Sequence, residues 1–233
     1  MKYKLTKNKK TIGEITVYQI EALKDFLNIK KGDLGGWIEK ESNLSHRGDC
    51  WVYGDARVYG RAMVCDNARV FGNAWVYGDA RVSVCAWLYG DAIVSGNAQV
   101  YGDAQVSGDA WVYGDARVYG DARVSGNARV SGNAMVFGNA RVSGNVMVYG
   151  DVLVYGRARV TGDARFYGDA QVSGNAIVSG NARVFGNAMV SGNAIVSGNA
   201  RVFGNAWVSG NARVFGNARV SGNAWVSGSA IIN

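Results

Sequence analysis

The chain of 233 residues contains no proline, one histidine and three cysteines. Proline cannot donate a backbone hydrogen bond to a neighbouring strand, so its absence suits a chain whose backbone donors are all engaged between strands. No run of about 18 apolar residues occurs, and the lysine-rich N-terminus lacks the apolar segment of a secretion signal. We therefore expect a soluble cytoplasmic protein that contacts no membrane.

The few cysteines and the single histidine argue against a metal or redox centre. Cys50, Cys65 and Cys85 occupy unlike positions in the repeat described below, so we expect free thiols in a reducing compartment. His46 alone cannot supply the three histidines of a zinc-dependent carbonic anhydrase. We predict no metal and no cofactor.

Charge is distributed unevenly along the chain. The formal net charge is +7, and all nine lysines lie within the first forty residues. After Asp169 there is no acidic residue, whereas Arg183, Arg201, Arg213 and Arg219 remain. The C-terminal third is therefore purely basic, and we expect it to attract anionic groups.

From Cys50 onward one six-residue unit, A-x-V-x-G-[ND], occurs thirty-one times without gaining or losing a residue. Alanine and valine alternate with variable positions, which is the period of a short strand with one buried face. Glycine followed by asparagine or aspartate tolerates left-handed or turn conformations. Each unit is therefore predicted to form a short strand followed by a corner.

A chain of such units buries its alanines and valines only by coiling, so that each coil covers the one before it. Three corners close a triangular coil of three units, which predicts a parallel β-solenoid of about ten coils over residues 50–233. A slip of one residue would expose every valine, and burying one valine contributes about 1.5 to 3 kcal/mol. The register is therefore strongly fixed.

Residues 1–49 do not repeat and are predicted to form a β-rich cap over an otherwise exposed strand edge. We expect two strands at residues 3–6 and 11–18 around a lysine-rich turn at residues 7–10. A short helix or irregular turn is expected at residues 19–27, and a glycine-rich turn at residues 31–37.

Two sets of motifs resemble known families, one for each set. An aliphatic residue followed four positions later by a small one, as in Val58 and Ala62, resembles the hexapeptide signature of left-handed β-helices. The runs QIEALKDF, GGWIE and GDCWVY, beginning at Gln19, Gly35 and Gly48, resemble the start of the YdcK-like transferases of bacteria and prophages. The resemblance covers nearly the whole chain and implies a left-handed coil and carriage by a prophage.

The same resemblance raises an enzymatic alternative. Hexapeptide acyltransferases use a histidine as general base, an acyl-CoA groove between neighbouring solenoids and a loop between coils. His46 lies before the regular repeats, and the repeats contain no insertion that could form such a loop. We therefore predict no catalytic residue, and an acyltransferase with a site built between subunits stays open as the alternative.

Three outward-facing sets of side chains are candidate contact surfaces. The first alternates arginines with aromatic rings, an array that can bind a polyanion or protein partner, or form only a surface ladder. It comprises Arg165, Arg183, Arg201, Arg219, Tyr149, Tyr167, Phe185 and Phe203. The second is an apolar stripe suited to self-association or partner docking, or is only an ordinary aromatic ladder, and comprises Tyr101, Tyr119, Met135, Phe137, Leu153 and Tyr155. The third is an end-to-end contact with another copy at Trp225, Ile231 and Ile232, whose alternative is a frayed end on a monomer.

These observations predict a non-catalytic β-solenoid that binds or assembles through its arginine and aromatic surfaces. We expect a homo-oligomer, with a host protein as a further partner if the chain is phage-encoded. Binding of nucleic acid or another polyanion is the second alternative.

Overall fold

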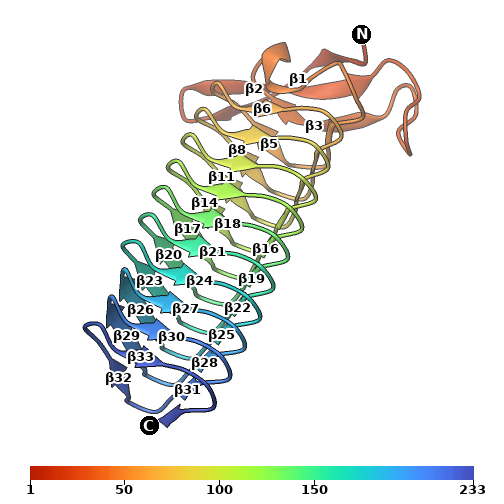
Figure 1. Ribbon diagram of the computed structural model, residues 1–233. Helices are drawn as coiled ribbons and strands as arrows, with labels where there is room; N and C mark the ends of the chain where they lie inside the picture. Colours follow the sequence, from red (N-terminus) through yellow and green to blue (C-terminus); the bar gives the residue numbers. More distant parts are fainter. The chain divides into compact units, whose positions relative to one another are not determined.

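The computed structural model describes residues 1–233, which divide into two compact units, Met1–Gly114 and Asp115–Asn233. Both units are all-β, and in each the short strands of successive coils lie side by side (Figure 1). One short 3-10 helix, η1 (Glu41–Asn43), interrupts the strands. No helix has the length and apolar character needed to span a membrane.

Unit 1 begins with three longer strands, β1 (Tyr3–Ile12), β2 (Ile15–Ala22) and β3 (Leu34–Ile38). Eleven two-residue strands follow: β4 (Trp51–Val52), β5 (Arg57–Val58), β6 (Met63–Val64), β7 (Arg69–Val70), β8 (Trp75–Val76), β9 (Arg81–Val82), β10 (Trp87–Leu88), β11 (Ile93–Val94), β12 (Gln99–Val100), β13 (Gln105–Val106) and β14 (Trp111–Val112). They form three parallel rows, β5-β8-β11-β14, β4-β7-β10-β13 and β6-β9-β12.

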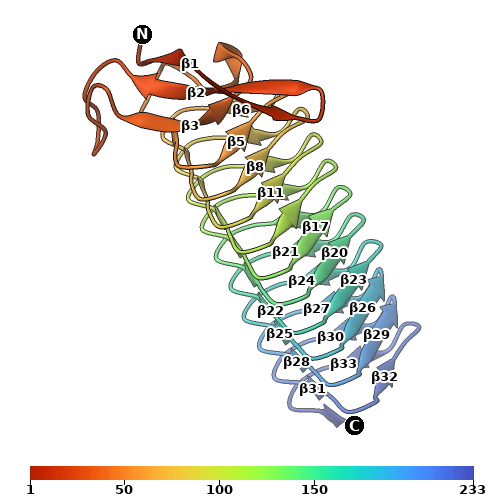
Figure 2. The same ribbon diagram turned by 180° about the vertical axis from the view of Figure 1, so that it is seen from behind.

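Unit 2 contains the remaining strands: β15 (Arg117–Val118), β16 (Arg123–Val124), β17 (Arg129–Ser131), β18 (Met135–Val136), β19 (Arg141–Val142), β20 (Met147–Tyr149), β21 (Leu153–Val154), β22 (Arg159–Val160), β23 (Arg165–Tyr167), β24 (Gln171–Val172), β25 (Ile177–Val178), β26 (Arg183–Gly186), β27 (Met189–Val190), β28 (Ile195–Val196), β29 (Arg201–Gly204), β30 (Trp207–Val208), β31 (Arg213–Val214), β32 (Arg219–Val220), β33 (Trp225–Val226) and β34 (Ile231–Ile232). Its first sheet runs from β17 through β20, β23, β26 and β29 to β32 (Figure 2). The second sheet runs from β16 to β34 and the third from β15 to β33.

The pairing confirms the predicted parallel solenoid with three strands in each coil. In unit 1, Arg57 of β5 lies opposite Trp75 of β8, and in unit 2 Arg183 of β26 lies opposite Arg201 of β29. Both pairs are separated by eighteen residues, the predicted length of one coil. The hand of the coil remains a prediction from the family resemblance.

In each unit the core is a column of inward side chains, as the repeat predicts. Every inward residue from Cys50 through Val214 is at most 1% exposed, which confirms the assignment of alanine and valine to the inside. Larger residues enter the column at Val146, Val152 and Phe166, and all three are fully buried. The column therefore tolerates some variation in volume while it keeps its register.

The N-terminal strands differ from the sequence prediction in where the chain turns. β1 and β2 are antiparallel and turn at Gly13 and Glu14, so the predicted turn at residues 7–10 is wrong. Those lysines lie within β1, where lysine is a common residue at a sheet edge. Lys10 has a structural role there, since its Nζ lies 4.1 Å from the centre of the Trp37 ring and 2.6 Å from a carboxylate oxygen of Asp55.

Two further predictions for the cap are corrected in part. Of the short helix or irregular turn expected at residues 19–27, the irregular turn forms from Leu23 onward and no helix does. The preceding residues, Gln19 to Ala22, extend β2 and bury Ile20 and Ala22. The predicted turn at residues 31–37 includes the first part of β3, which pairs with β2 and, in parallel, with β5. Gly36 is required there, because a Cβ would lie 2.5 Å from Cγ1 of Val52.

The corners depend on glycine for conformation and for space. Gly78 has a φ of 72°, and a Cβ on it would lie 2.9 Å from the backbone nitrogen of Gly96 in the next coil. Gly54 has a similar φ of 57°, but the nearest atom to a Cβ there is 3.7 Å away. Two corners depart from this pattern, because Asp66 and Val84 adopt positive φ values without being glycine.

We expect Gly78→Ala to destabilise unit 1 more than Gly54→Ala. Both substitutions place a side chain in a left-handed conformation, which costs about 1 to 2 kcal/mol. Gly78→Ala also forces apart two backbones in contact, which adds about 1 to 3 kcal/mol. Urea unfolding of both variants measures the difference, and equal losses of stability would show that the spacing between coils is not limiting at the corners.

Candidate functional site

The eight residues predicted as a polyanion or partner surface lie on one sheet. They project from β20, β23, β26, β29 and β32 in the first sheet of unit 2. Arg165, Arg183, Arg201 and Arg219 are partners in successive parallel pairs, and all four are exposed. The structure therefore assembles one column of four guanidinium groups from strands far apart in the sequence.

Aromatic rings accompany this arginine column. Tyr167 pairs with Phe185, and the rings of Phe185 and Phe203 stack with centroids 4.9 Å apart. The guanidinium carbon of Arg219 lies 5.6 Å from the centre of the Phe203 ring, within the range of a cation–π contact. Tyr149 is the most exposed of the four aromatic residues, with 57% of its surface accessible.

The charges of unit 2 leave the arginine column largely unneutralised. Unit 2 contains eleven arginines, five aspartates, no lysine and no glutamate, an excess of six positive charges. None of the four arginines in the column forms an ion pair. Their positive field therefore faces solvent, and it can attract an anionic group from another molecule.

The predicted self-association stripe forms a ring stack on the third sheet of unit 2. Tyr119, Phe137 and Tyr155 stack with centroid distances of 4.9 and 5.0 Å, and Met135 lies opposite Leu153 in register. These side chains are half-buried because each ring covers the next. Tyr101, the remaining member, lies in unit 1 directly after β12. Self-association through the stripe stays a prediction.

The predicted end-to-end contact residues lie on β33 and β34. Trp225 and Ile231 are 68% and 64% exposed, and Ile232 is half-buried. The Trp225 ring stacks on that of Trp207 at 5.3 Å. Whether a second copy covers these side chains stays a prediction.

His46 is poorly placed for catalysis. Its Nδ1 accepts a hydrogen bond of 3.2 Å from the backbone N–H of Lys2, and its ring stacks on Tyr3 at a centroid distance of 4.4 Å. Its Nε2 is buried and has no hydrogen-bond partner. Burial lowers the pKa of His46, because the surroundings disfavour the cation. The residue is therefore part of the packing of the cap rather than an exposed side chain.

A buried lysine beside a cysteine, which the sequence pattern did not indicate, holds the cap to the first coil. The Nζ of Lys2 donates to the carbonyl oxygens of Gly48 and Cys50 at 3.2 and 2.7 Å, and to the Sγ of Cys50 at 3.2 Å. Burial raises the pKa of the Cys50 thiol. Burial, together with the negative charge of the nearby Asp66 carboxylate, raises the pKa of the Cys65 thiol to about 11. These two thiols are therefore weak nucleophiles at neutral pH.

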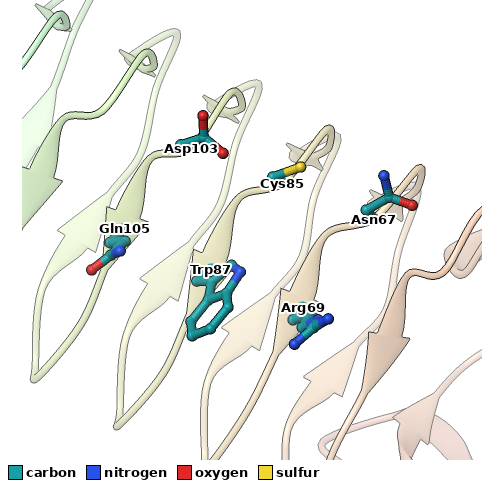
Figure 3. Close-up of a pocket in the computed structure, with 6 residues that line it drawn as sticks. All are labelled: Asn67, Arg69, Cys85, Trp87, Asp103 and Gln105. Carbon is teal, nitrogen blue, oxygen red and sulfur yellow. The ribbon is translucent and has the colours of Figure 1, made fainter. Parts of the chain in front are cut away.

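A second feature missed from the sequence is a groove of about 360 Å³ beside Trp87 in unit 1 (Figure 3). Trp87 is 41% exposed, and the guanidinium carbon of Arg69 lies 5.4 Å from its ring centre. Figure 3 shows Trp87 between Arg69 and Gln105, with a second row of three residues at the corners, Asn67, Cys85 and Asp103.

The sequence contains one indication of this groove, which is the irregular corner beside it. Val84 and Cys85 replace the usual glycine and asparagine or aspartate, and Cys85 cannot continue the side-chain ladder between Asn67 and Asp103. The groove combines an aromatic ring with one cation, one anion and two amides. Such a lining suits a neutral, hydrogen-bonding molecule better than a polyanion.

Comparison with known proteins identifies the family. The model of the YdcK β-solenoid repeat matches residues 62–78, 86–102, 98–114, 104–118, 116–130, 128–143, 140–156, 170–184, 182–198, 196–210, 206–220, 212–228 and 218–232, more than half of the chain. A protein of Escherichia coli (strain K12) named "Uncharacterized acetyltransferase YdcK" is 36% identical over 58 residues, which are 24% of this chain and 18% of that protein. The chain thus matches less than a fifth of that relative's length. On the repeat matches and the fold together, the chain belongs to the YdcK β-solenoid repeat family.

Proposed function

We propose that the protein is a non-catalytic binding and assembly module whose main contact surface is the arginine column on the first sheet of unit 2. The observation that supports this proposal is the exposed run of Arg165, Arg183, Arg201 and Arg219 without ion pairs, beside stacked rings. Its partner presents an anionic surface that the guanidinium forks can bind. An acidic protein of a host cell fits this description.

The packed backbone favours binding over catalysis. Three arginines of the column, Arg165, Arg183 and Arg201, donate their N–H groups to the carbonyl oxygens of alanines in the next coil, each at 2.9 Å. The backbone is therefore ordered before a partner arrives, which reduces the entropy lost on association. A rigid array of long side chains is well suited to a broad anionic surface.

An acyltransferase is the alternative, and the name of the E. coli relative supports it. Against it stands the geometry of His46, because its Nδ1 is already hydrogen-bonded and its Nε2 is buried. A general base must reach the proton that it removes. The enzymatic alternative therefore requires a base other than His46, or a site that forms between two copies of the chain.

Nucleic acid is the other anionic ligand to consider. Arginine interleaved with aromatic rings can contact phosphates and stack on unpaired bases. The arginine column in unit 2 has both components, but its rings stack on one another, as Phe185 and Phe203 do. Stacked rings leave less aromatic face for bases, so a protein partner is favoured.

We expect the double variant Arg183→Glu/Arg201→Glu to bind its partner about tenfold or more weakly, since it replaces attraction with repulsion at the centre of the column. Heparin, a sulfated polymer, serves as the first probe, followed by capture of proteins from host lysate. The matched control is Arg123→Glu/Arg213→Glu, which makes the same change in net charge on the second sheet of unit 2. Equal losses in both variants would mean that net charge, and not this column, governs binding.

Two further measurements separate the alternatives. Binding of single-stranded DNA or RNA whose affinity falls steeply with salt would favour nucleic acid over a protein partner. A rise in Tm with acetyl-CoA, unchanged by Arg183→Glu/Arg201→Glu, would favour the acyltransferase and count against the proposed function.

We expect the pKa of His46 to lie below the ordinary value of about 6.5 in the folded protein, because burial disfavours its cation. The unfolded chain then binds more protons than the folded one near this pH, so stability should fall as pH drops below about 6.5. A titration of the imidazole C–H signals by NMR gives the value directly. A pKa above 6.5, together with rapid exchange of the ring with solvent, would restore His46 as a candidate base.

A further inference from the structure

A second concentration of arginines lies on a different sheet from the arginine column. Asn139, Arg141, Arg157 and Arg159 line a groove of about 250 Å³ on the second sheet of unit 2. Arg141 and Arg159 project from β19 and β22, and Asn139 and Arg157 occupy the corners just before these strands. Three guanidinium groups and one amide therefore converge on a small surface hollow.

Arg157 is unusual for its position in the repeat. The corner residue that follows glycine is asparagine or aspartate in nearly every unit, and arginine occurs there only at Arg61 and Arg157. Arg61 has a structural partner one coil further on, since its Nε lies 2.6 Å from a carboxylate oxygen of Asp79. The residues above and below Arg157 are Asn139 and Asn175, so no carboxylate in the adjacent coils can pair with it.

The three arginines also face one another without compensation. Arg141 and Arg159 are direct partners across adjacent strands, an arrangement in which like charges repel. None of the three forms an ion pair. The nearest acid in the corner column is Asp121, two coils from Arg157 and so about 10 Å away. The groove is therefore positive and lacks an anion of its own.

The backbone holds these groups in place. Asn139 and Arg157 donate their N–H groups to the carbonyl oxygens of Gly156 and Gly174 at 2.8 and 2.7 Å. Arg141 and Arg159 donate in the same way to Ala158 and Ala176, both at 2.9 Å. The main chain is therefore fixed at these positions, and a bound anion would offset the repulsion between the exposed guanidinium groups.

We propose that this groove binds the phosphoryl group of a small phosphate monoester. A phosphoryl dianion offers three acceptor oxygens, which match three guanidinium forks, and the Asn139 amide can contribute a further donor. The groove is too small for a folded partner but has room for a phosphoryl group and part of its ester substituent. This site does not depend on the proposed function, because it lies on a different sheet and takes a different class of ligand.

Titration calorimetry at low ionic strength tests the site in the full chain. The probes are inorganic phosphate and glucose 6-phosphate, with glucose as the uncharged control. We expect both phosphates to bind, glucose not to bind, and Arg157→Asn to weaken phosphate binding about tenfold, the effect of losing one charge-assisted hydrogen bond. Asparagine is the common corner residue, so this variant should fold, and Arg159→Gln provides a second variant with the same expected loss.

The matched control is Arg213→Gln, which removes one positive charge from β31, three coils and so about 14 Å from Arg159, and should change phosphate affinity less than about twofold. Affinity for glucose 6-phosphate should also rise between about pH 5 and pH 8, because a phosphate monoester loses its second proton near pH 6 while arginine stays charged. Sulfate, whose charge is constant in this range, should show no such rise.

The outcomes distinguish the sources of the ligand. Tighter binding of glucose 6-phosphate than of phosphate supports an ester, whereas equal binding supports free phosphate as the occupant of the same site. Absence of binding by both probes, or equal weakening by Arg157→Asn and Arg213→Gln, would overturn the proposal. If this test fails, the proposed function of the arginine column still stands. That function is tested separately, by the heparin binding of Arg183→Glu/Arg201→Glu.

Discussion

The parallel hydrogen bonds between coils are the constraint on which the remaining structure depends. Outward residues donate their N–H groups to the carbonyls of inward residues in the next coil, as Arg57 does to Ala74 at 2.9 Å. Burial of the inward residues fixes the register of these bonds, since a slip would bring alanine and valine into water. The position of every outward side chain then follows from its position in the repeat.

This constraint turns a one-dimensional repeat into columns of like groups, and the proposed contact surfaces are such columns. In unit 2 the same geometry gives a row of exposed arginines on one sheet, a stack of aromatic rings on another and an arginine-lined hollow on a third. A globular fold would need many separate loops to align four guanidinium groups at a spacing of about 5 Å. In this fold, arginine at the same repeat position in four successive coils is sufficient to align them. This arrangement suits the proposed binding surface.

The repeat made the solenoid and its columns predictable, because its contacts recur at a fixed separation. The arginine column could be assigned residue by residue before the structure was known, and the register confirms that placement. The cap was predicted poorly, since its strand ends depend on partners far apart in sequence, such as Tyr18 with Ile38. The Trp87 groove and the buried Lys2 were missed, because each depends on an exception to the pattern, whose effect is visible only when neighbouring coils are in place.

The coil length of eighteen residues also has a genetic consequence. Loss or duplication of eighteen codons would remove or add one turn and leave every surviving side chain in its column. Loss of a single six-residue unit would instead move all downstream side chains to the neighbouring sheet and break the arginine row in two. Natural variants of this gene should therefore differ in length mainly by whole turns, and a variant that departs from this rule should have lost the surface that the row provides.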